Sequence, residues 1–180
     1  MAEKTTLTET IAIPDGINVT IDKDIIIVKG EKGELLKQLM HPKIQINVTN
    51  KEVKIEYPAS SKRKVRALVG TYKAHIKNMI KGATEGFTYT MKTVFSHFPI
   101  KTKVEGNEFL IENFLGERSP RRALILDGVT VSVQGDEVKV TSADKEKLGQ
   151  TVANIERASK VTRRDIRVFQ DGVYLISKGG

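Results

Sequence analysis

The sequence contains one pattern of alternating residues twice, and this repeat constrains the fold more than any other feature. Residues 44–48 and 53–55 alternate apolar and polar side chains, and residues 129–133 and 138–140 do the same 85 positions later. Alternation with a period of two is typical of half-buried antiparallel strands. Short polar turns, Asn50-Lys51 and Gly135-Asp136, lie between the strands of the two copies. The chain is therefore expected to contain two related β-hairpins.

A helical pattern follows each hairpin. After the first one, apolar side chains recur at the spacing of a single helix face, namely Val65, Leu68, Val69, Tyr72, Ile76, Met79 and Ile80. We expect Ser60 or Ser61 to cap the start of this helix and Gly82 to end it. The second helix is expected at about residues 143–158.

The two helices align at a shorter offset than the two hairpins. Gly149 aligns with Gly70 and Ile155 with Ile76, 79 positions apart, so six residues of the first copy are missing from the second. Residues 58–63 account for those six. Their Pro- and Ser-rich composition marks a surface loop, which is where a duplicated domain tolerates insertions.

These patterns together predict the fold class and the domain organisation. With 39% hydrophobic residues in 180, the chain can bury a core in each of two small units. We expect an α+β fold of two tandem repeats, each an antiparallel sheet packed against one helix. The domains are expected at residues 1–85 and 86–180, and the second includes a basic C-terminal segment.

Half of the formal net charge of +8 lies in residues 157–180. The cations of this segment are Arg157, Lys160, Arg163, Arg164, Arg167 and Lys178, and its only acidic residues are Asp165 and Asp171. Arginine makes bidentate contacts with phosphate, and a basic strip on a folded platform is typical of nucleic-acid binders. The alternative is a solvated charged face.

Apolar residues interrupt this basic segment, and we expect them to anchor it on the second repeat. They are Ile166, Val168, Phe169, Val173 and Tyr174. The turn Asp171-Gly172 is expected to reverse the chain, because glycine adopts backbone conformations that other residues avoid.

Two further clusters of cations are candidate nucleic-acid contacts. Arg118, Arg121 and Arg122 lie in the expected loop 116–122, where Pro120 would prevent a regular ladder. A secondary contact is expected from Lys62, Arg63, Lys64 and Arg66. Cations at a helix start oppose the helix dipole, so an external anion would relieve a local cost. A mobile lysine-rich loop is the alternative reading of this second cluster.

Residues that carry out chemistry are absent from the sequence. There is no cysteine, and the three histidines, His41, His75 and His97, have no partner at metal-ligand spacing. We therefore expect no catalytic residue, no metal site and no cofactor. No apolar run reaches the roughly 18 residues that span a bilayer, so a membrane partner is not expected. The absence of cysteine fits a reduced, cytoplasmic compartment.

One glycine motif has two readings. Gly30-Glu31-Lys32-Gly33 matches the GxxG spacing of KH domains, whose loop joins two helices. Here the motif lies between two strand patterns, so we expect a hairpin turn instead.

Five segments resemble the archaeal and eukaryotic branch of the large-subunit ribosomal protein L-six family, called L-nine in eukaryotes. Residues 165–178 are similar to the C-terminal signature of that family. Residues 28–35 resemble its first hairpin, residues 78–87 the junction of its halves, and residues 97–100 and 113–118 the opening of its second half. The five segments follow the order of the family.

The resemblance implies a structural constituent of the large ribosomal subunit and not an enzyme. It implies binding of large-subunit rRNA near the sarcin–ricin loop and the translation-factor site, with neighbouring ribosomal proteins as further partners. With 6% aromatic residues and no tryptophan, recognition of duplex RNA by phosphate and shape is expected. The alternative class is an RNA-processing enzyme or nuclease, which would need clustered carboxylates, and the acidic residues here are scattered.

Overall fold

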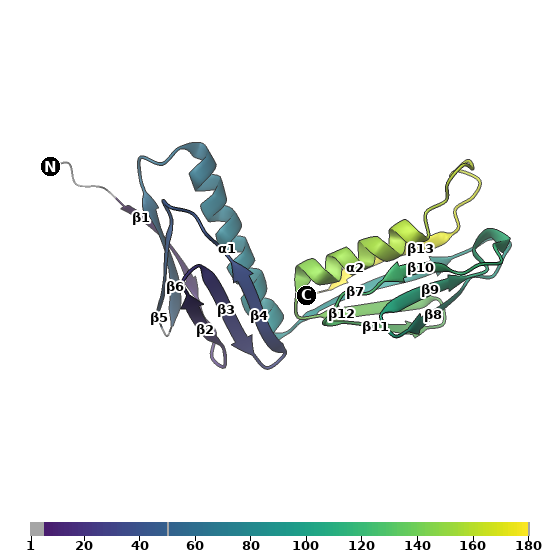
Figure 1. Cartoon of the computed structure of the whole chain (residues 1–180), viewed down its shortest axis with the longest axis horizontal. Coiled ribbons are helices and arrows are strands. Elements are labelled where there is room, and N and C mark those ends of the chain that lie inside the picture. The colour runs from purple at the N-terminus through teal and green to yellow at the C-terminus, as the bar shows by residue number, and fades with distance from the viewer. Residues whose placement is uncertain (1–5, 50, 180) are drawn as a thin grey trace. The chain divides into compact units, whose positions relative to one another are not determined.

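A computed structural model describes residues 6–49 and 51–179, and it confirms the α+β fold class. The chain divides into two compact units, residues 1–85 (unit 1) and residues 86–180 (unit 2). Figure 1 shows unit 1 in purple to blue and unit 2 in teal to yellow. Each unit contains one α-helix and two antiparallel sheets in its described part, where one sheet per unit was expected.

Unit 1 contains two three-stranded sheets and one long helix. Its elements are β1 (Thr6–Ala12), β2 (Asn18–Asp22), β3 (Ile25–Gly30), β4 (Gly33–Gln38), β5 (Gln45–Thr49), β6 (Glu52–Pro58) and α1 (Arg63–Thr84). The sheets have the strand orders β1-β6-β5 and β2-β3-β4. The hairpin predicted from the alternation is present as β5 and β6, with Val48 opposite Val53. Asn50, in the expected turn of this hairpin, lies outside the described residues.

The core of unit 1 forms where the apolar face of α1 packs against the strands. Val53 and Ile55 of β6 and Ile76 of α1 are completely buried. They are packed in one cluster with Val28 of β3 and Ala83 near the end of α1. The helix face predicted from the spacing is therefore the buried face.

The ends of α1 differ from the sequence expectation. Lys62 occupies the N-cap position and no side chain caps the helix, so neither Ser60 nor Ser61 does so. The helix also continues through Gly82, which is buried, to Thr84. The carbonyl of Ala83 accepts a hydrogen bond from the backbone N–H of Lys32 in the β3–β4 turn. Packing and hydrogen bonding against this turn stabilise the last helical residues and outweigh the tendency of glycine to end helices.

The β3–β4 connection is a hairpin turn, as predicted, because Gly30 and Gly33 lie opposite each other in the ladder. Gly33 has a φ of 137°, which few other residues adopt. Gly30 is required for a different reason. A Cβ atom on Gly30 would lie 2.5 Å from the carbonyl oxygen of Ala83.

Unit 2 repeats this arrangement and adds one strand. Its elements are β7 (Phe87–Val94), β8 (Lys101–Glu105), β9 (Glu108–Glu112), the 3-10 helix η1 (Phe114–Gly116), β10 (Arg121–Leu124), β11 (Val129–Gln134), β12 (Glu137–Ser142), α2 (Lys145–Ala158) and β13 (Gly172–Gly179). The sheets have the strand orders β11-β12-β7-β13 and β10-β9-β8. The carboxylate of Asp144 caps α2 by accepting the N–H groups of Glu146 and Lys147.

The sheet orders show that the sequence repeat is a repeat of topology. The order β5-β6-β1 in unit 1 corresponds to β11-β12-β7 in unit 2, and β2-β3-β4 corresponds to β8-β9-β10. Val133 pairs with Val138 as Val48 pairs with Val53, at the offset of 85. Strand β13 has no counterpart among the described strands of unit 1. It pairs antiparallel with β7 and holds the end of the basic segment against the sheet.

Candidate RNA interface

Most of the basic segment forms a loop of residues 159–171 between α2 and β13, which we call the basic loop. It extends beyond the end of α2 in Figure 1, at the yellow-green end of unit 2. Most of its side chains are exposed, and the buried ones, Ser159, Val161 and Asp171, lie at or near its two ends. The cations in the middle of this loop are thus presented to solvent.

The anchoring of this segment differs from the sequence expectation. Ile166 and Val168 are 69% and 68% exposed, and Tyr174 is also exposed. Val173 is completely buried and Phe169 is half-buried against the core of unit 2. The apolar pattern could not distinguish these positions, because the intervening residues form a loop and not a strand with one inward face.

Hydrogen bonds from α2 to β13 close the base of the basic loop. The backbone N–H of Val173 donates to the hydroxyl of Ser159 (3.0 Å), and that of Leu175 donates to the carboxylate of Glu156 (3.0 Å). Both side chains lie at the C-terminal end of α2. They fix the two ends of the loop relative to each other, so less conformational entropy is lost when a partner binds. Neither Glu156 nor Ser159 stands out in the sequence, because their bonding partners in β13 are distant along the chain.

Gly172 has a structural role other than the predicted chain reversal. It is not among the positive-φ residues of the described chain, and it begins strand β13. A Cβ atom at Gly172 would lie 2.8–2.9 Å from the ring of Tyr174. A side chain at this position would therefore require the exposed ring of Tyr174 to move.

The arginines of the basic loop are held in three different ways. Arg163 has a left-handed backbone (φ 60°) and is exposed. The guanidinium of Arg164 lies 4.7 Å from the ring centre of Phe169, a cation–π contact. Arg167 pairs with Asp165, with an Nη2–Oδ2 distance of 2.9 Å, while its side chain remains 86% exposed. Hydrogen bonds from Arg167 lower the pKa of Asp165, so this carboxylate is charged and partly offsets the positive loop.

Arg121 belongs to the predicted cluster of Arg118, Arg121 and Arg122, and it bonds that part of unit 2 to the basic loop. It is a structural residue. Its guanidinium donates to both carboxylate oxygens of Glu117 and to the carbonyls of Ala158 and Lys160. It also lies 4.0 Å from the ring centre of Phe114. With its donors used inside the protein, Arg121 is not available for phosphate, and we exclude it from the proposed contacts.

Replacing Arg121 with alanine is expected to destabilise unit 2 by about 2–3 kcal/mol, because charged hydrogen bonds and a cation–π contact are lost together. Arg122 is the matched control, since its ion pair with Glu108 is exposed and Arg122→Ala is expected to cost less than about 0.5 kcal/mol. Urea unfolding of the two variants measures this difference. Equal midpoints for the two variants would contradict the structural role of Arg121.

The bond to Arg121 also predicts a pH dependence. The hydrogen bonds from Arg121 lower the pKa of Glu117 below the ordinary value of 4.5, and the positive charge of Arg164 lowers it slightly further. The stabilisation is therefore complete above the ordinary carboxyl pKa and is lost as the pH falls through the lower pKa of the folded state.

Of the remaining predicted residues, three are exposed near the basic loop and one, Lys178, lies away from it. Arg118 is exposed, as are Arg157 in the last turn of α2 and Lys160 at the start of the basic loop. Arg121 and Arg122 belong to strand β10 and not to a loop, so the loop beginning at Gly116 ends at Pro120. Lys178 lies near the other end of β13, about 20 Å along the strand from Gly172, so it is not part of the loop cluster.

The secondary cluster in unit 1 lies at the start of α1, as expected. Lys62, Arg63, Lys64 and Arg66 are all exposed, and the first turn contains no acidic residue. The Nη2 atom of Arg66 donates to the carbonyl of Ala59 (2.8 Å), so this arginine is partly engaged.

The described residues offer no group of three His, Asp or Glu side chains that could hold a metal ion. His41 and His75 are partly buried, and His97 is exposed beside Phe98 in the segment after β7. Within the part of the chain that is described, no helix is long and apolar enough to cross a membrane.

Comparison with known proteins identifies the family. The model of the family described as "Ribosomal protein L6" matches residues 13–86 and 98–172, one match in each unit. The chain belongs to the ribosomal protein L6 family. Membership confirms both the predicted resemblance and the two-fold repeat.

Curated relatives agree with this assignment. The chain is 47% identical over 173 residues to "Large ribosomal subunit protein uL6" of Methanospirillum hungatei, covering 96% of this chain and 98% of that protein. It is 49% identical over 166 residues to the protein of the same name from Methanothrix thermoacetophila, covering 92% and 94%. Members of the ribosomal protein L6 family are structural proteins, so the expectation that this chain is not an enzyme is confirmed.

Proposed function

We propose that this protein braces large-subunit rRNA near the sarcin–ricin loop, beside the site where translation factors bind, and that unit 2 makes the main contact. Membership of the family makes the chain a structural constituent of the large ribosomal subunit, which places it with rRNA and other ribosomal proteins on the cytoplasmic ribosome. The rRNA region, the contact residues and the proximity of translation factors are the proposed part.

The basic loop is the observation that carries this proposal. It presents exposed arginines on a segment whose two ends are hydrogen-bonded to each other and to the core of unit 2. Such a braced surface suits phosphate contacts to a folded RNA, because little ordering is required on binding. The proposed contacts are Arg118, Arg122, Arg157, Lys160, Arg163, Arg164 and Arg167, with Lys178 as a more distant one.

The exposed aliphatic residues of the loop support the same reading. Ile166 and Val168 alternate with Asp165 and Arg167 and have no cover in the described structure of unit 2. Large apolar side chains that remain exposed beside cations are typical of surfaces that a partner covers. We propose that they pack against riboses or a neighbouring protein while the arginines contact phosphates.

We also propose that residues 1–85 and 86–180 are independent domains, which makes the assignment of RNA binding testable. A fragment of residues 86–180 is expected to fold cooperatively and to bind large-subunit rRNA within about tenfold of the whole chain, since most of the phosphate contacts belong to unit 2. The fragment must include Phe87, which is buried in the core of unit 2. Thermal unfolding and filter binding measure both properties.

The complementary fragment is the control for this experiment. Residues 1–85 contain a complete core of their own and are expected to fold, but to bind rRNA far more weakly. Chemical footprinting of the rRNA with fragment 86–180 then tests the location. Protection outside the domain that contains the sarcin–ricin loop would contradict the proposed site, and equal affinity of the two fragments would contradict the assignment to unit 2.

A further inference from the structure

Helix α1 carries a concentration of positive charge that the proposed contact in unit 2 does not use. Its 22 residues contain six lysines and arginines, Arg63, Lys64, Arg66, Lys73, Lys77 and Lys81, and no aspartate or glutamate. Helix α2 differs, because Glu146 and Glu156 offset part of its charge. The two helices occupy the same place in the repeat, so the repeat itself does not account for the charge of α1.

The exposed face of α1 combines these cations with a line of small residues. Ala67, Gly70 and Ala74 are exposed and follow each other at helical spacing on one ridge. By the same spacing, Arg66, Lys73 and Lys77 lie along one side of this ridge, and Arg63 and Lys81 lie in line with its two ends. A partner can therefore approach the helix backbone closely while cations remain within reach.

Gly70 has no role in the packing of unit 1. A Cβ atom there would meet nothing within 4 Å, and the residue lies in the interior of a helix, where glycine is unfavourable compared with alanine. An open helical glycine is not by itself a sign of binding, since Gly149 of α2 is open too. What distinguishes Gly70 is that it lies among the cations of α1, where the missing side chain leaves room for a partner.

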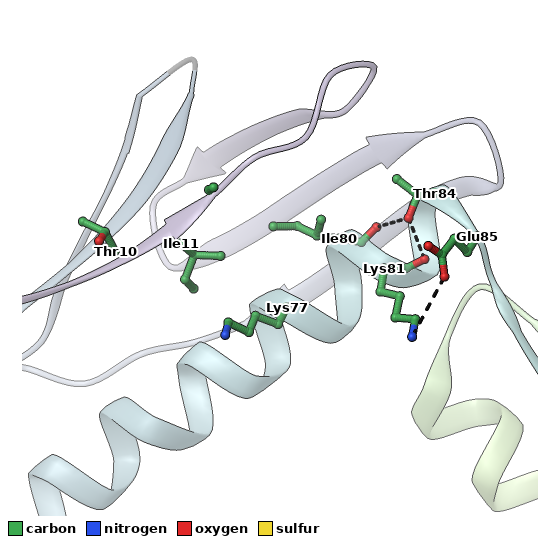
Figure 2. Close-up of a pocket in the computed structure, with 8 residues that line it drawn as sticks. Thr10, Ile11, Lys77, Ile80, Lys81, Thr84 and Glu85 are labelled. Atoms are coloured by element: carbon green, nitrogen blue, oxygen red, sulfur yellow. Dashed lines mark hydrogen bonds and ion pairs between the residues drawn. The ribbon is translucent and has the colours of Figure 1, made fainter. Parts of the chain in front are cut away.

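The ridge leads to a recess at the C-terminal half of α1. Thr10, Ile11 and Ala12 of β1 line one side of it, and Lys77, Ile80, Lys81, Thr84 and Glu85 line the other. Figure 2 shows the amino groups of Lys77 and Lys81 at the rim and the apolar side chains of Ile11 and Ile80 between the strand and the helix. Lys81 is only loosely paired with Glu85, at 3.9 Å. The recess thus offers an apolar floor and a rim that carries two lysines and the carboxylate of Glu85, and the two lysines are placed to meet phosphates on either side of a ribose.

We propose that this face of α1, from Arg63 to Lys81, is a second RNA-binding surface that follows the sugar–phosphate backbone of a duplex in large-subunit rRNA. The proposal rests on the proposed function, in which rRNA is the partner. Its length of about 27 Å allows it to contact several phosphates in succession. RNA fits better than a protein partner because Arg63, Lys64 and Lys77 have no ion pair in the described structure. The two carboxylates beside this face, Glu9 and Glu85, are already paired with Lys73 and Lys81.

A single substitution separates binding from stability on this face. Gly70→Gln is expected to raise the melting temperature by about 2–4 °C, since glutamine favours helix, and to weaken binding to a large-subunit rRNA transcript about three- to tenfold by blocking close approach. Gly149→Gln in α2 is the matched control, because Gly149 is the aligned residue and is also open. It is expected to stabilise similarly and to leave affinity unchanged.

A charge experiment tests the same surface independently. The double variant Arg63→Gln, Lys77→Gln in the full chain is expected to weaken binding about three- to tenfold and to make the salt dependence shallower. Its control, Lys43→Gln, Lys51→Gln, removes equal charge from exposed positions outside α1 and is expected to bind as the parent does.

The outcomes distinguish this inference from the proposed function. If the parent does not bind the transcript, or footprints elsewhere, the proposed function fails. If the parent binds but Gly70→Gln and the Arg63, Lys77 double variant bind equally well, the α1 surface is wrong while unit 2 keeps its assignment. A loss shared equally by the control variants would also overturn the inference, because the effect would then be unspecific.

Discussion

Replacing Arg163, Arg164 and Arg167 with alanine is expected to weaken binding to large-subunit rRNA at least about tenfold, or about 1.4 kcal/mol, with little change in melting temperature. All three side chains are exposed on the basic loop, whose ends are fixed by Ser159 and Glu156. The loss of the Arg164–Phe169 contact costs only about 0.5–1 kcal/mol at an exposed site. We therefore expect these side chains to contribute to binding far more than to folding.

The salt dependence of binding is a second measurement on the triple arginine variant. On duplex DNA, each phosphate contact makes the slope of log affinity against log salt steeper by about 0.9. We use this coefficient for duplex RNA as well. Removing three contacts should reduce the slope by up to about 3. A control that replaces Lys92, Lys101 and Lys139 of unit 2 with alanine removes the same charge elsewhere. Normal binding by the arginine variant, or an equal loss in the control, would contradict the role of the basic loop.

Replacing Gly30 with valine is expected to destabilise unit 1 by about 2–4 kcal/mol, because the added side chain cannot fit between the β3–β4 hairpin and the end of α1. The new Cβ atom would lie 2.5 Å from the Ala83 carbonyl oxygen and 2.9 Å from the Ala83 Cβ atom. The hairpin would have to move away, and the hydrogen bond from Lys32 to Ala83 would be lost with it. A fall of about 10–30 °C in the melting temperature of unit 1 is expected.

Glu31→Ala is the control for this substitution, since Glu31 is exposed in the same turn and its replacement should change stability by less than about 0.5 kcal/mol. Differential scanning calorimetry separates the two units if they unfold independently. A Gly30→Val variant that melts like the parent would show that the close approach of the hairpin to α1 is not required.

Local periodicity explains which parts of the fold could be predicted. The hairpins β5–β6 and β11–β12 and the buried face of α1 were predicted because alternation and helical spacing are properties of neighbouring residues. The second sheet of each unit and the pairing of β13 with β7 were not, because these contacts join distant segments. The continuation of α1 through Gly82 to Thr84 was missed because packing against the β3–β4 turn, and not local propensity, determines where the helix ends.

In the candidate interface, too, the sequence shows what depends on neighbouring residues and not what depends on contacts between distant segments. The clustering of cations in residues 157–167 is visible in the sequence, but which of them are free is not. Arg121 and Arg122 are adjacent, and only the fold shows that Arg121 is bonded to Glu117, Ala158 and Lys160 while Arg122 remains exposed. Likewise, Val173 and Ile166 look equivalent in the sequence, and only Val173 is buried.

The pairing of β13 with β7 has a consequence for the order of events during synthesis. Strand β7 leaves the translating ribosome first among the elements of unit 2, and at about 5–20 residues per second its partner β13 follows several seconds later. Until then, one edge of β7 is open to unwanted pairing, and the basic loop has no fixed second end. The arginines therefore acquire their fixed presentation only when β13 closes the sheet. A nascent chain that lacks β13 would carry nearly all of the positive charge without the braced loop, so we expect it to bind large-subunit rRNA less tightly than the complete chain does.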